Sequence, residues 1–514
     1  MKTGSVILVG AGPGDAGLIT VKGLQRLQQA DCVIYDGLAN PALLREVKPE
    51  AELINVRKRT GDHPVKQNEI NALLVEKAKQ GKRVVRLKGG DPCLFGRAAE
   101  EVAACADAGV PIEIVPGVTS GMAAAEYAGI FLTDRDSASA VAFITGRQAE
   151  GKTEDGLNWA ALAAFEGTLV FYMAMGTLGE IAQRLMEHGK GGQTPAAVVH
   201  QATLPQQRVV EGVLCDIAQR CERASVGAPS IVIIGQGAKV RPSADWFMRQ
   251  PLFGKRVVIT RDAEGNRVFA QLLAACGAEP VAVDSIEIVP LAQTPAVRQS
   301  LMQIGGFDWV VFTSANGVTA AFEGLSACGA DARIFGGVRV ACIGQQTARR
   351  LRQYGLAADF IPSAFTSTAL AEELAGFDAL AGKKILLLRS EIAPPDFRRH
   401  LESLGAAVTE TAVYTVRPRR IEAAQATELK DRLTAGQMDW LTFTSTSTVK
   451  AFLEAVSLEC VRACGVKIAS IGPATTEYLN SINLPPTVEA KVHTVEGLID
   501  AISNLKCQMS NVKC

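Results

Sequence analysis

Short apolar runs alternate with helical patterns from Ser5 to Gly235. The apolar runs predict strands at residues 6–10, 32–36, 83–87, 112–115, 141–145, 169–173, 196–200 and 231–235. Between two of them, residues 67–80 predict an amphipathic helix whose apolar face is Ile70, Leu73, Leu74 and Ala78, and Gly81 follows as its terminator. Strands that alternate with helices in this way predict an α/β fold.

The alternation stops at residues 241–254, RPSADWFMRQPLFG, which contain two prolines and neither a helical nor a strand period. A chain of 514 residues is also too long for one ordinary hydrophobic core. We therefore predict a first domain over residues 1–240, a linker over 241–252, a second domain over 253–505 and a fraying tail over 506–514.

The second domain contains an internal repeat. Residues 253–290 recur as residues 382–418, and four matched pairs are each displaced by 128 positions: Gly254 and Gly382, Arg261 and Arg389, Gly277 and Gly405, Pro290 and Pro418. The repeat predicts two similar α/β halves. We expect a small ligand to bind between them, because loops at the carboxyl ends of strands from both halves can face one cleft.

Composition narrows the function classes. The 53 basic residues balance 53 acidic ones, so no overall positive field favours nucleic acid as a partner. The 12 cysteines are scattered without a Cys-x-x-Cys pair and there are 5 histidines, so we expect reduced thiols and no metal site. No apolar run approaches the ~18 residues of a membrane span, and the N-terminus lacks a secretory pattern. These features predict a cytoplasmic protein without a membrane partner.

The loop Gly10-Ala11-Gly12-Pro13-Gly14-Asp15 follows a predicted strand and precedes a helix. It does not fit the dinucleotide fingerprint, because Asp15 occupies the third glycine position and Pro13 has no backbone N–H to donate to a pyrophosphate. Asp36 at the next strand end could still mimic a ribose-binding acid. A nicotinamide-dependent oxidoreductase therefore stays as an alternative.

Further motifs lie in the predicted strands or in the segments between them: Lys88-Gly89-Gly90-Asp91-Pro92, Phe95-Gly96-Arg97, Val115-Pro116-Gly117-Val118-Thr119-Ser120, LVFYM at 169–173 and TLPQQRVVEG at 203–212. With the first loop, they resemble the uroporphyrinogen-III C-methyltransferase branch of the tetrapyrrole methylases over roughly residues 5–240. The resemblance implies a two-lobed domain, a homodimer formed through it, and S-adenosylmethionine as cofactor. The implied cofactor contacts are Pro13, Gly89, Gly90, Asp91, Leu94, Thr119, Ser120, Met173 and Ala202.

The same resemblance implies that Asp36 is the catalytic aspartate and Lys58 the catalytic lysine. Arg57 and Arg59 flank this lysine and would suit a substrate with many carboxylates, although a solvated basic turn is an equally simple interpretation. The sequence departs from the family at Gly37, Asp134 and Arg147, where arginine, histidine and histidine are usual. A domain that binds S-adenosylmethionine but has altered or lost methyl transfer is therefore an alternative.

The duplicated part resembles uroporphyrinogen-III synthase over roughly residues 253–505. The resemblance rests on FTS-type strand ends at 312–314 and 443–445, IG turns at 343–344 and 471–472, and the runs FTS at 365–367, LRS at 388–390 and AVY at 412–414. It implies one lobe from about 253–288 with 418–505 and another from 290–416. Each serine or threonine could instead cap a helix. The implied substrate contacts are Thr313, Ser314, Thr347, Ser367, Ser445 and Thr475, with Tyr414 assisting loss of a hydroxyl group.

Together the two resemblances imply a bifunctional enzyme that acts on small tetrapyrroles. The second domain would close hydroxymethylbilane to uroporphyrinogen III with inversion of ring D. The first would methylate that product through precorrin-1 to precorrin-2, a precursor of siroheme and cobalamin. Such chemistry depends mainly on holding the reacting atoms in place.

Overall fold

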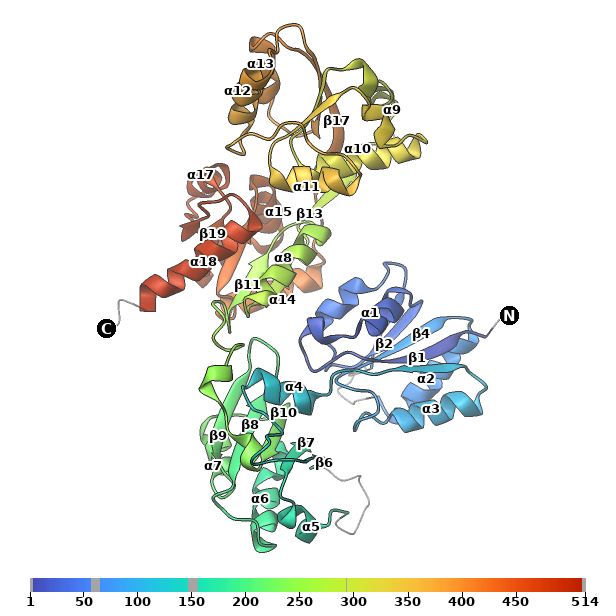
Figure 1. Ribbon diagram of the computed structural model, residues 1–514, viewed down its shortest axis with the longest axis vertical. Helices are drawn as coiled ribbons and strands as arrows, with labels where there is room; N and C mark the ends of the chain where they lie inside the picture. Colours follow the sequence, from blue (N-terminus) through green and yellow to red (C-terminus); the bar gives the residue numbers. More distant parts are fainter. Residues whose placement is uncertain (1–2, 57–64, 147–155, 293, 511–514) are drawn as a thin grey trace. The chain divides into compact units, whose positions relative to one another are not determined.

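The computed structural model describes residues 3–56, 65–146, 156–292 and 294–510. The chain divides into two compact units, one made of Met1–Lys255 with Leu273–Glu279 and the other of Arg256–Leu272 with Pro280–Cys514 (Figure 1). Within the described residues, every helix is too short or too polar to span a bilayer.

The first lobe of the first unit is built on a parallel sheet with strand order β3-β2-β4-β1-β5. The strands are β1 Ser5–Gly10, β2 Cys32–Tyr35, β3 Glu52–Asn55, β4 Arg83–Lys88 and β5 Ile112–Val115. The helices are α1 Val21–Gln28, α2 Gln67–Lys79 and α3 Ala98–Asp107, with short turns η1 Ala16–Leu18 and η2 Pro41–Glu46.

Helices cover both faces of this sheet. Along β1, Val6 and Leu8 pack with α2 and α3, whereas Ile7 and Val9 pack with α1 on the opposite face. Burial on both faces explains why these strands are continuous apolar runs in the sequence. The helix predicted over residues 67–80 is confirmed as α2, and Gly81 beyond its end has a φ of +83°.

The second lobe carries a mixed sheet with strand order β6-β7-β10-β8-β9, in which only β6 and β7 pair in parallel. Helices α5, α6 and α7 pack on one face and α4 on the other. The strands are β6 Val141–Thr145, β7 Thr168–Tyr172, β8 Pro195–His200, β9 Arg208–Val213 and β10 Ser230–Ile234. The helices are α4 Ser120–Tyr127, α5 Trp159–Ala164, α6 Leu178–Glu187 and α7 Ile217–Arg223, with turns η3 Met175–Thr177, η4 Gln236–Ala238 and η5 Pro242–Ala244.

The segment expected to be a linker, residues 241–252, packs on the first unit instead of standing free of it. Phe247 is buried, and its ring centre lies 4.7 Å from that of Tyr127 in α4. Trp246 packs on the same tyrosine with 4.8 Å between ring centres. Aromatic contacts of this kind bury much apolar area. They hold this segment against the first unit although it contains two prolines.

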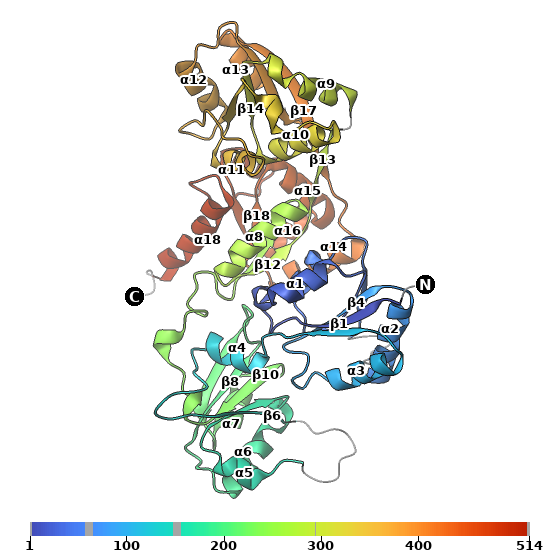
Figure 2. The same ribbon diagram turned by 45° about the vertical axis from the view of Figure 1, so that its right-hand side comes forward.

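The second unit contains two sheets (Figure 2). The first has strand order β12-β11-β18-β19-β20, with β11 Arg256–Ile259, β12 Glu279–Ala282, β18 Trp440–Phe443, β19 Lys467–Ser470 and β20 Val488–Glu489. Its helices are α8 Ala263–Ala275, α14 Ala423–Thr434, α15 Thr446–Val456, α16 Leu458–Cys464, α17 Pro473–Ser481 and α18 Val495–Ser510.

The other sheet has strand order β13-β17-β16-β14-β15 and belongs to the middle of the sequence. Its strands are β13 Ile286–Pro290, β14 Trp309–Phe312, β15 Arg339–Cys342, β16 Lys384–Ser390 and β17 Ala407–Pro418. Its helices are α9 Pro295–Met302, α10 Ala315–Ala327, α11 Gln345–Gln353, α12 Ser367–Phe377 and α13 Asp396–Ser403, with turns η6 Ile304–Gly306 and η7 Ala332–Phe335.

The predicted duplication is confirmed by the two sheets. The order β12-β11-β18-β19 in one corresponds to β17-β16-β14-β15 in the other, strand for strand along the repeat. The middle sheet adds β13, which runs antiparallel to β17 from Ile286, paired with Pro418, to Pro290, paired with Tyr414. The expected lobe boundary at 288–290 therefore falls inside a strand.

Candidate functional site

Three glycine loops of the first unit meet at the carboxyl ends of β1, β4 and β5. Gly12 and Gly90 exchange backbone hydrogen bonds, with N···O distances of 3.3 and 2.7 Å. A Cβ atom on Gly117 would lie 2.3 Å from the carbonyl oxygen of Gly90, and one on Gly10 would lie 2.5 Å from the Cα of Gly117. Only glycine permits this approach. The loops lie where open parallel sheets bind their ligands.

Asp36, the predicted catalytic aspartate, belongs to a fourth loop that joins this cluster. Leu38 N donates to Asp36 Oδ1 at 3.0 Å, and 29% of the Asp36 side chain is exposed. Asn40 Nδ2 donates to the carbonyl oxygen of Gly14 at 2.6 Å. A Cβ on Gly89 would lie 2.7 Å from that of Leu38. Asp36 therefore lies beside the expected cofactor loops and is accessible to a ligand.

Asp91 ties two of these loops together. Its Oδ1 accepts from Cys93 N at 2.8 Å and its Oδ2 from Gly117 N at 3.0 Å. Ser120, at the start of α4, lies against Gly90, because a Cβ there would come 3.4 Å from its Oγ. The carboxylate thus orders the backbone of the site, and its remaining lone pairs are available to a ligand.

The second lobe contributes Tyr172 at the end of β7. Its hydroxyl accepts from Gly121 N at 2.8 Å and lies 2.7 Å from Thr119 Oγ1. Burial raises the pKa of Tyr172. Met173 follows with a positive φ of 54° and is 52% exposed. Leu94 and Ala202 both pack with the apolar cluster that contains Tyr172. Of the predicted cofactor residues, Leu94, Thr119 and Ala202 therefore contact this tyrosine or its apolar cluster.

A second connection between the lobes was not predicted from the sequence. Tyr127 OH donates to Asp15 Oδ2 at 2.8 Å, and Asp15 N donates to Thr203 Oγ1 at 2.9 Å. Burial, followed by the bond to Asp15, raises the pKa of Tyr127. Thr203 stands in the TLPQQ motif, but Tyr127 belongs to no motif. Its role could be found only from contacts between residues far apart in the sequence.

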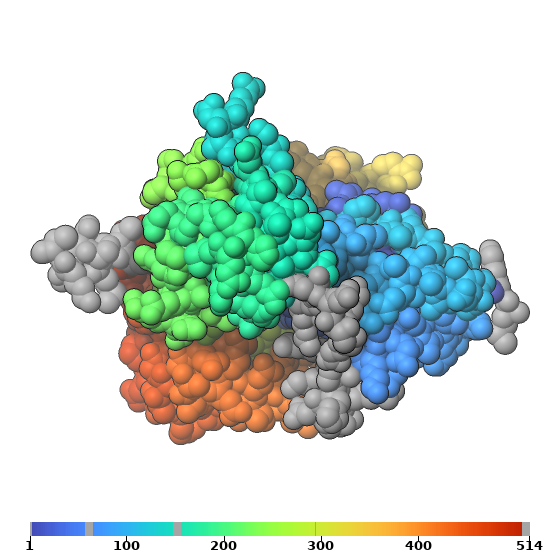
Figure 3. All heavy atoms as spheres, turned by 90° about the horizontal axis from the view of Figure 1, so that it is seen from below, coloured from blue at the N-terminus to red at the C-terminus, as the bar shows by residue number. Residues whose placement is uncertain are grey.

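Four residues singled out in the sequence lie outside the described residues: the predicted catalytic Lys58, the predicted substrate contacts Arg57 and Arg59, and Arg147, one of the departures from the family. Of the departures from the family that are described, Gly37 is exposed in the loop after Asp36. Asp134 pairs with Arg241 at 2.6 Å, which lowers the pKa of the carboxyl group. This bond anchors the teal segment between α4 and β6, which projects from the surface in Figure 3.

In the second unit, the middle sheet brings together Thr313, Ser314 and Tyr414 at the carboxyl end of β14. Ser314 Oγ lies 3.0 Å from Tyr414 OH and also accepts from Gly317 N at 3.0 Å, as the N-cap of α10. Tyr414 is 7% exposed. Ser314 therefore caps a helix, and its hydroxyl also contacts the predicted tyrosine, while its role as a substrate contact stays a prediction.

The other predicted hydroxyls differ in exposure. Thr347 in α11 and Thr475 in α17 hold equivalent places in the repeat, and each is only 4% exposed. Ser445 is the N-cap of α15, where the side chains of Ser445 and Thr448 each accept a hydrogen bond from the backbone N–H of the other. Ser367, the first residue of α12, is exposed. Ser445 and Ser367 can present their hydroxyl groups more readily than the two buried threonines can.

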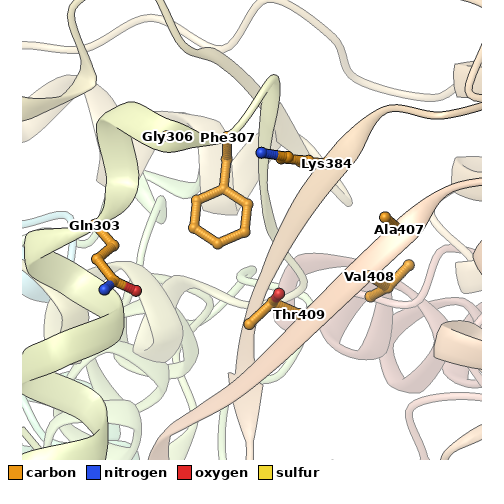
Figure 4. A pocket seen from close by; sticks show the side chains of 7 residues that line it. All are labelled: Gln303, Gly306, Phe307, Lys384, Ala407, Val408 and Thr409. Carbon is orange, nitrogen blue, oxygen red and sulfur yellow. The ribbon is translucent and has the colours of Figure 1, made fainter.

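A cavity of about 720 Å³ opens on the middle sheet at the opposite edge from Ser314 and Tyr414 (Figure 4). It lies at the amino ends of β16 and β17, where Lys384 and Thr409 line it together with Phe307. Sheets of this type bind ligands at the carboxyl ends of their strands, so this cavity is not part of the candidate site. Among the described residues, no cluster of three or more His, Cys, Asp or Glu side chains could hold a metal ion.

Comparison with known proteins gives two family matches in sequence order. Residues 5–218 match the tetrapyrrole (corrin/porphyrin) methylases, and residues 267–500 match uroporphyrinogen-III synthase HemD. The uroporphyrinogen-III C-methyltransferase of Bacillus subtilis is 41% identical over 65% of this chain and 68% of its own. A uroporphyrin-III C-methyltransferase from Thermus thermophilus, solved with S-adenyl homocysteine, is 36% identical over 45% of this chain and 98% of its own, with a TM-score of 0.40.

One relative matches along both units. The porphyrin biosynthesis protein HemD of Ruminiclostridium josui is 35% identical over 502 residues, which are 98% of each chain. A match of this extent includes both family segments in the same order. The chain is therefore an enzyme of the porphyrin-biosynthesis family in which a tetrapyrrole methylase is followed by a uroporphyrinogen-III synthase.

Proposed function

We propose that the chain carries out two consecutive reactions on tetrapyrroles. Its second domain, residues 253–505, cyclises hydroxymethylbilane to uroporphyrinogen III with inversion of ring D. Its first domain, residues 1–240, methylates uroporphyrinogen III with S-adenosylmethionine through precorrin-1 to precorrin-2, for siroheme or cobalamin synthesis. A homodimer formed through the first domain is part of this proposal and rests on the family resemblance.

The observation that carries the methyl-transfer proposal is the convergence of the glycine loops with Asp36. In this proposal, backbone groups of Pro13, Gly89 and Gly90 and the hydroxyl of Thr119 would border the cofactor, and Leu94 and the exposed Met173 would supply apolar surface. This mixture of neutral polar and apolar groups fits the adenosine and amino-acid ends of S-adenosylmethionine. When bound, that cofactor would supply an electrophilic methyl group on a sulfonium centre.

Methyl transfer to a pyrrole carbon requires alignment of the reacting atoms and removal of a proton. In the proposed mechanism, the loops orient the cofactor and the Asp36 carboxylate accepts the proton from the methylated ring. The lysine and arginines of residues 57–59 would hold substrate carboxylates. These residues follow β3 in the sequence, and β3 pairs with β2, the strand directly before Asp36, which supports this role.

For ring closure, the proposal rests on hydroxyl groups at the strand ends of both sheets. Ser314 and Tyr414 form one such pair, 3.0 Å apart. The tyrosine hydroxyl would assist loss of the bilane hydroxyl group, and serine hydroxyls with helix N-terminal N–H groups would hold propionate and acetate side chains. Binding that favours one folded form of the bilane would select inversion of ring D.

The proposal is tested by giving the purified protein hydroxymethylbilane with and without S-adenosylmethionine and following the tetrapyrroles by chromatography and mass. We expect uroporphyrinogen III without cofactor and a product heavier by two methyl groups with it. Ring closure without any methylation would favour the alternative in which the first domain binds S-adenosylmethionine but has lost transfer. Formation of the I isomer alone would refute the synthase role.

A further inference from the structure

Glu101 in α3 is a fully buried carboxylate that the proposed mechanism does not use. Lys88 Nζ donates to both of its oxygens, at 2.9 and 3.0 Å, and Arg86 Nε donates to one of them at 3.1 Å. Gln67 Nε2 adds a fourth bond at 3.2 Å. Arg86 and Lys88 are each 4% exposed. One carboxylate thus holds two cations inside the first lobe.

This buried cluster carries one positive charge in excess until Asp36 is included. Arg86 Nη2 lies 3.5 Å from Asp36 Oδ2, which makes two carboxylates for two cations. Burial, and then the neighbouring charge of Arg86, lowers the pKa of Lys88. Because buried ion pairs cost desolvation energy and often add little to stability, the arrangement indicates a role beyond holding the fold together.

Arg86 is fixed so that it can orient Asp36. Its Nη1 donates to the carbonyl oxygen of Leu87 at 3.2 Å and to that of Ile34 at 3.5 Å. Ile34 is in β2, two residues before Asp36, so the guanidinium contacts both the strand and the carboxylate that follows it. Glu101 accepts the remaining Nε–H. The chain of contacts therefore runs from α3 through Arg86 to the site.

We infer that Glu101 is a positioning residue for methyl transfer, because it holds Arg86 and Lys88 and thereby fixes the guanidinium that orients the Asp36 carboxylate. The inference rests on the proposed role of Asp36 as the proton acceptor. Glu101 itself contacts neither cofactor nor substrate in this arrangement. It acts on the rate through geometry, as supporting residues of an active site do.

The test compares Glu101→Gln with the wild type in the full-length protein. Glutamine keeps the shape of the side chain but leaves Arg86 and Lys88 without their shared counter-charge. We expect the kcat of methyl transfer to fall at least tenfold, whereas the Kd of S-adenosylhomocysteine changes less than twofold, because the glycine loops are untouched. The synthase rate of the same preparation, carried by the second unit, should not change and measures the concentration of protein, while binding of S-adenosylhomocysteine reports that the first unit is folded.

Glu113→Gln is a matched control. Glu113 also bridges a lysine and an arginine of this lobe, Lys22 at 2.6 Å and Arg26 at 2.9 Å, but its side chain is 32% exposed and makes no contact with Asp36 among the bonds described. We expect wild-type kcat from this variant. Loss of rate in both variants would mean that any broken ion pair slows the enzyme, and the inference would be wrong.

Glu101→Asp serves if the glutamine variant does not fold, which loss of its S-adenosylhomocysteine binding would reveal. The shorter carboxylate keeps the charge but cannot reach both cations as well, so we expect a kcat between those of the wild type and Glu101→Gln, with unchanged ligand affinity. Wild-type kcat in Glu101→Asp and in any folded Glu101→Gln refutes the inference. A parallel loss of kcat and of S-adenosylhomocysteine affinity in Glu101→Asp also refutes it.

Asp36→Asn separates this inference from the proposed function. If Asp36→Asn transfers methyl groups as fast as the wild type, the proposed role of Asp36 fails and the inference fails with it. If Asp36→Asn is inactive and the Glu101 variants are unaffected, the function stands and the inference alone is refuted. Absence of methyl transfer by the wild type overturns both.

Discussion

Replacement of Gly117 by alanine tests whether the three glycine loops meet as closely as the structure describes. The added Cβ would lie 2.3 Å from the carbonyl oxygen of Gly90 and 2.7 Å from the Cα of Gly10. Comfortable contact between such atoms needs about 3.5 Å. The loops must therefore separate by about 1 Å, and both neighbours are backbone atoms, which cannot turn aside as a flexible side chain can.

Overpacking of this kind costs about 1–3 kcal/mol, which corresponds to about 5- to 150-fold in an equilibrium constant. The loops can move apart in the free protein. The free energy needed to bring them together again then reduces the free energy of ligand binding. We expect the Kd for S-adenosylhomocysteine, measured by titration calorimetry, to rise within that range. Any part of the cost not seen in binding should appear as a lower midpoint of thermal unfolding, by about 2–4 °C per kcal/mol.

Gly179→Ala provides the matched control. Gly179 lies in α6, and a Cβ there would meet no atom within 4 Å. This variant should bind ligand as the wild type does and gain about 0.5–1 kcal/mol of stability from helix propensity. If Gly117→Ala keeps both its ligand affinity and its unfolding midpoint, the close packing of the loops is refuted.

Three further predictions concern other contacts. Tyr414→Phe removes the hydroxyl beside Ser314 and should slow ring closure by about tenfold or more; unchanged formation of the III isomer, resolved by chromatography, would contradict this. Tyr127→Phe removes the bond to Asp15 and should cost about 1 kcal/mol, measured as unfolding of the first unit in urea; equal stability would show that the bond is unimportant. Burial raises the pKa of Cys342 to about 12, so the folded protein keeps a neutral thiol that the unfolded chain loses above its ordinary pKa. Its contribution to stability should therefore be complete below about pH 8.5 and decline from there towards pH 12; modification of this thiol by iodoacetamide in the native protein, located by mass spectrometry, would refute its burial.

In the first unit, the sequence predicted all six strands that lie inside the two sheets, and of the four edge strands it predicted β5 and β6 but missed β3 and β9. In β3, Glu52–Asn55, the two central residues are apolar and the two outer ones polar, and every residue is exposed or half-buried. In β9, Arg208–Val213, every residue is exposed or half-buried. Edge strands need fewer apolar residues because one edge of the strand faces solvent. A search for continuous apolar runs therefore passes over β3 and β9.

The candidate site was predictable where backbone shape decides it. Glycine loops after strands predicted the region around Gly90 and Gly117, because the close approach of the loops excludes other residues. The bond from Asp15 N to Thr203 was not predictable, since the two residues are 188 positions apart and each is ordinary in its own context. Likewise, nothing near Glu101 in the sequence indicates that it accepts bonds from two cations of a neighbouring strand.

The insertion of the middle sheet into the repeat has a consequence for synthesis on the ribosome. Thr260, directly after β11, donates to the carbonyl oxygen of Thr442 in β18, 182 residues later. At about 5–20 residues per second, the nascent chain carries the apolar strand Arg256–Ile259 for roughly 10–40 s before β18, its partner on one side, exists. The middle sheet, whose strands lie between Ile286 and Pro418, can form during that interval. A strand translated after the whole middle sheet is therefore the one that completes the pairing of one of the first strands of this unit, and a ribosome that stalls before β18 would leave that strand open to chaperones or aggregation.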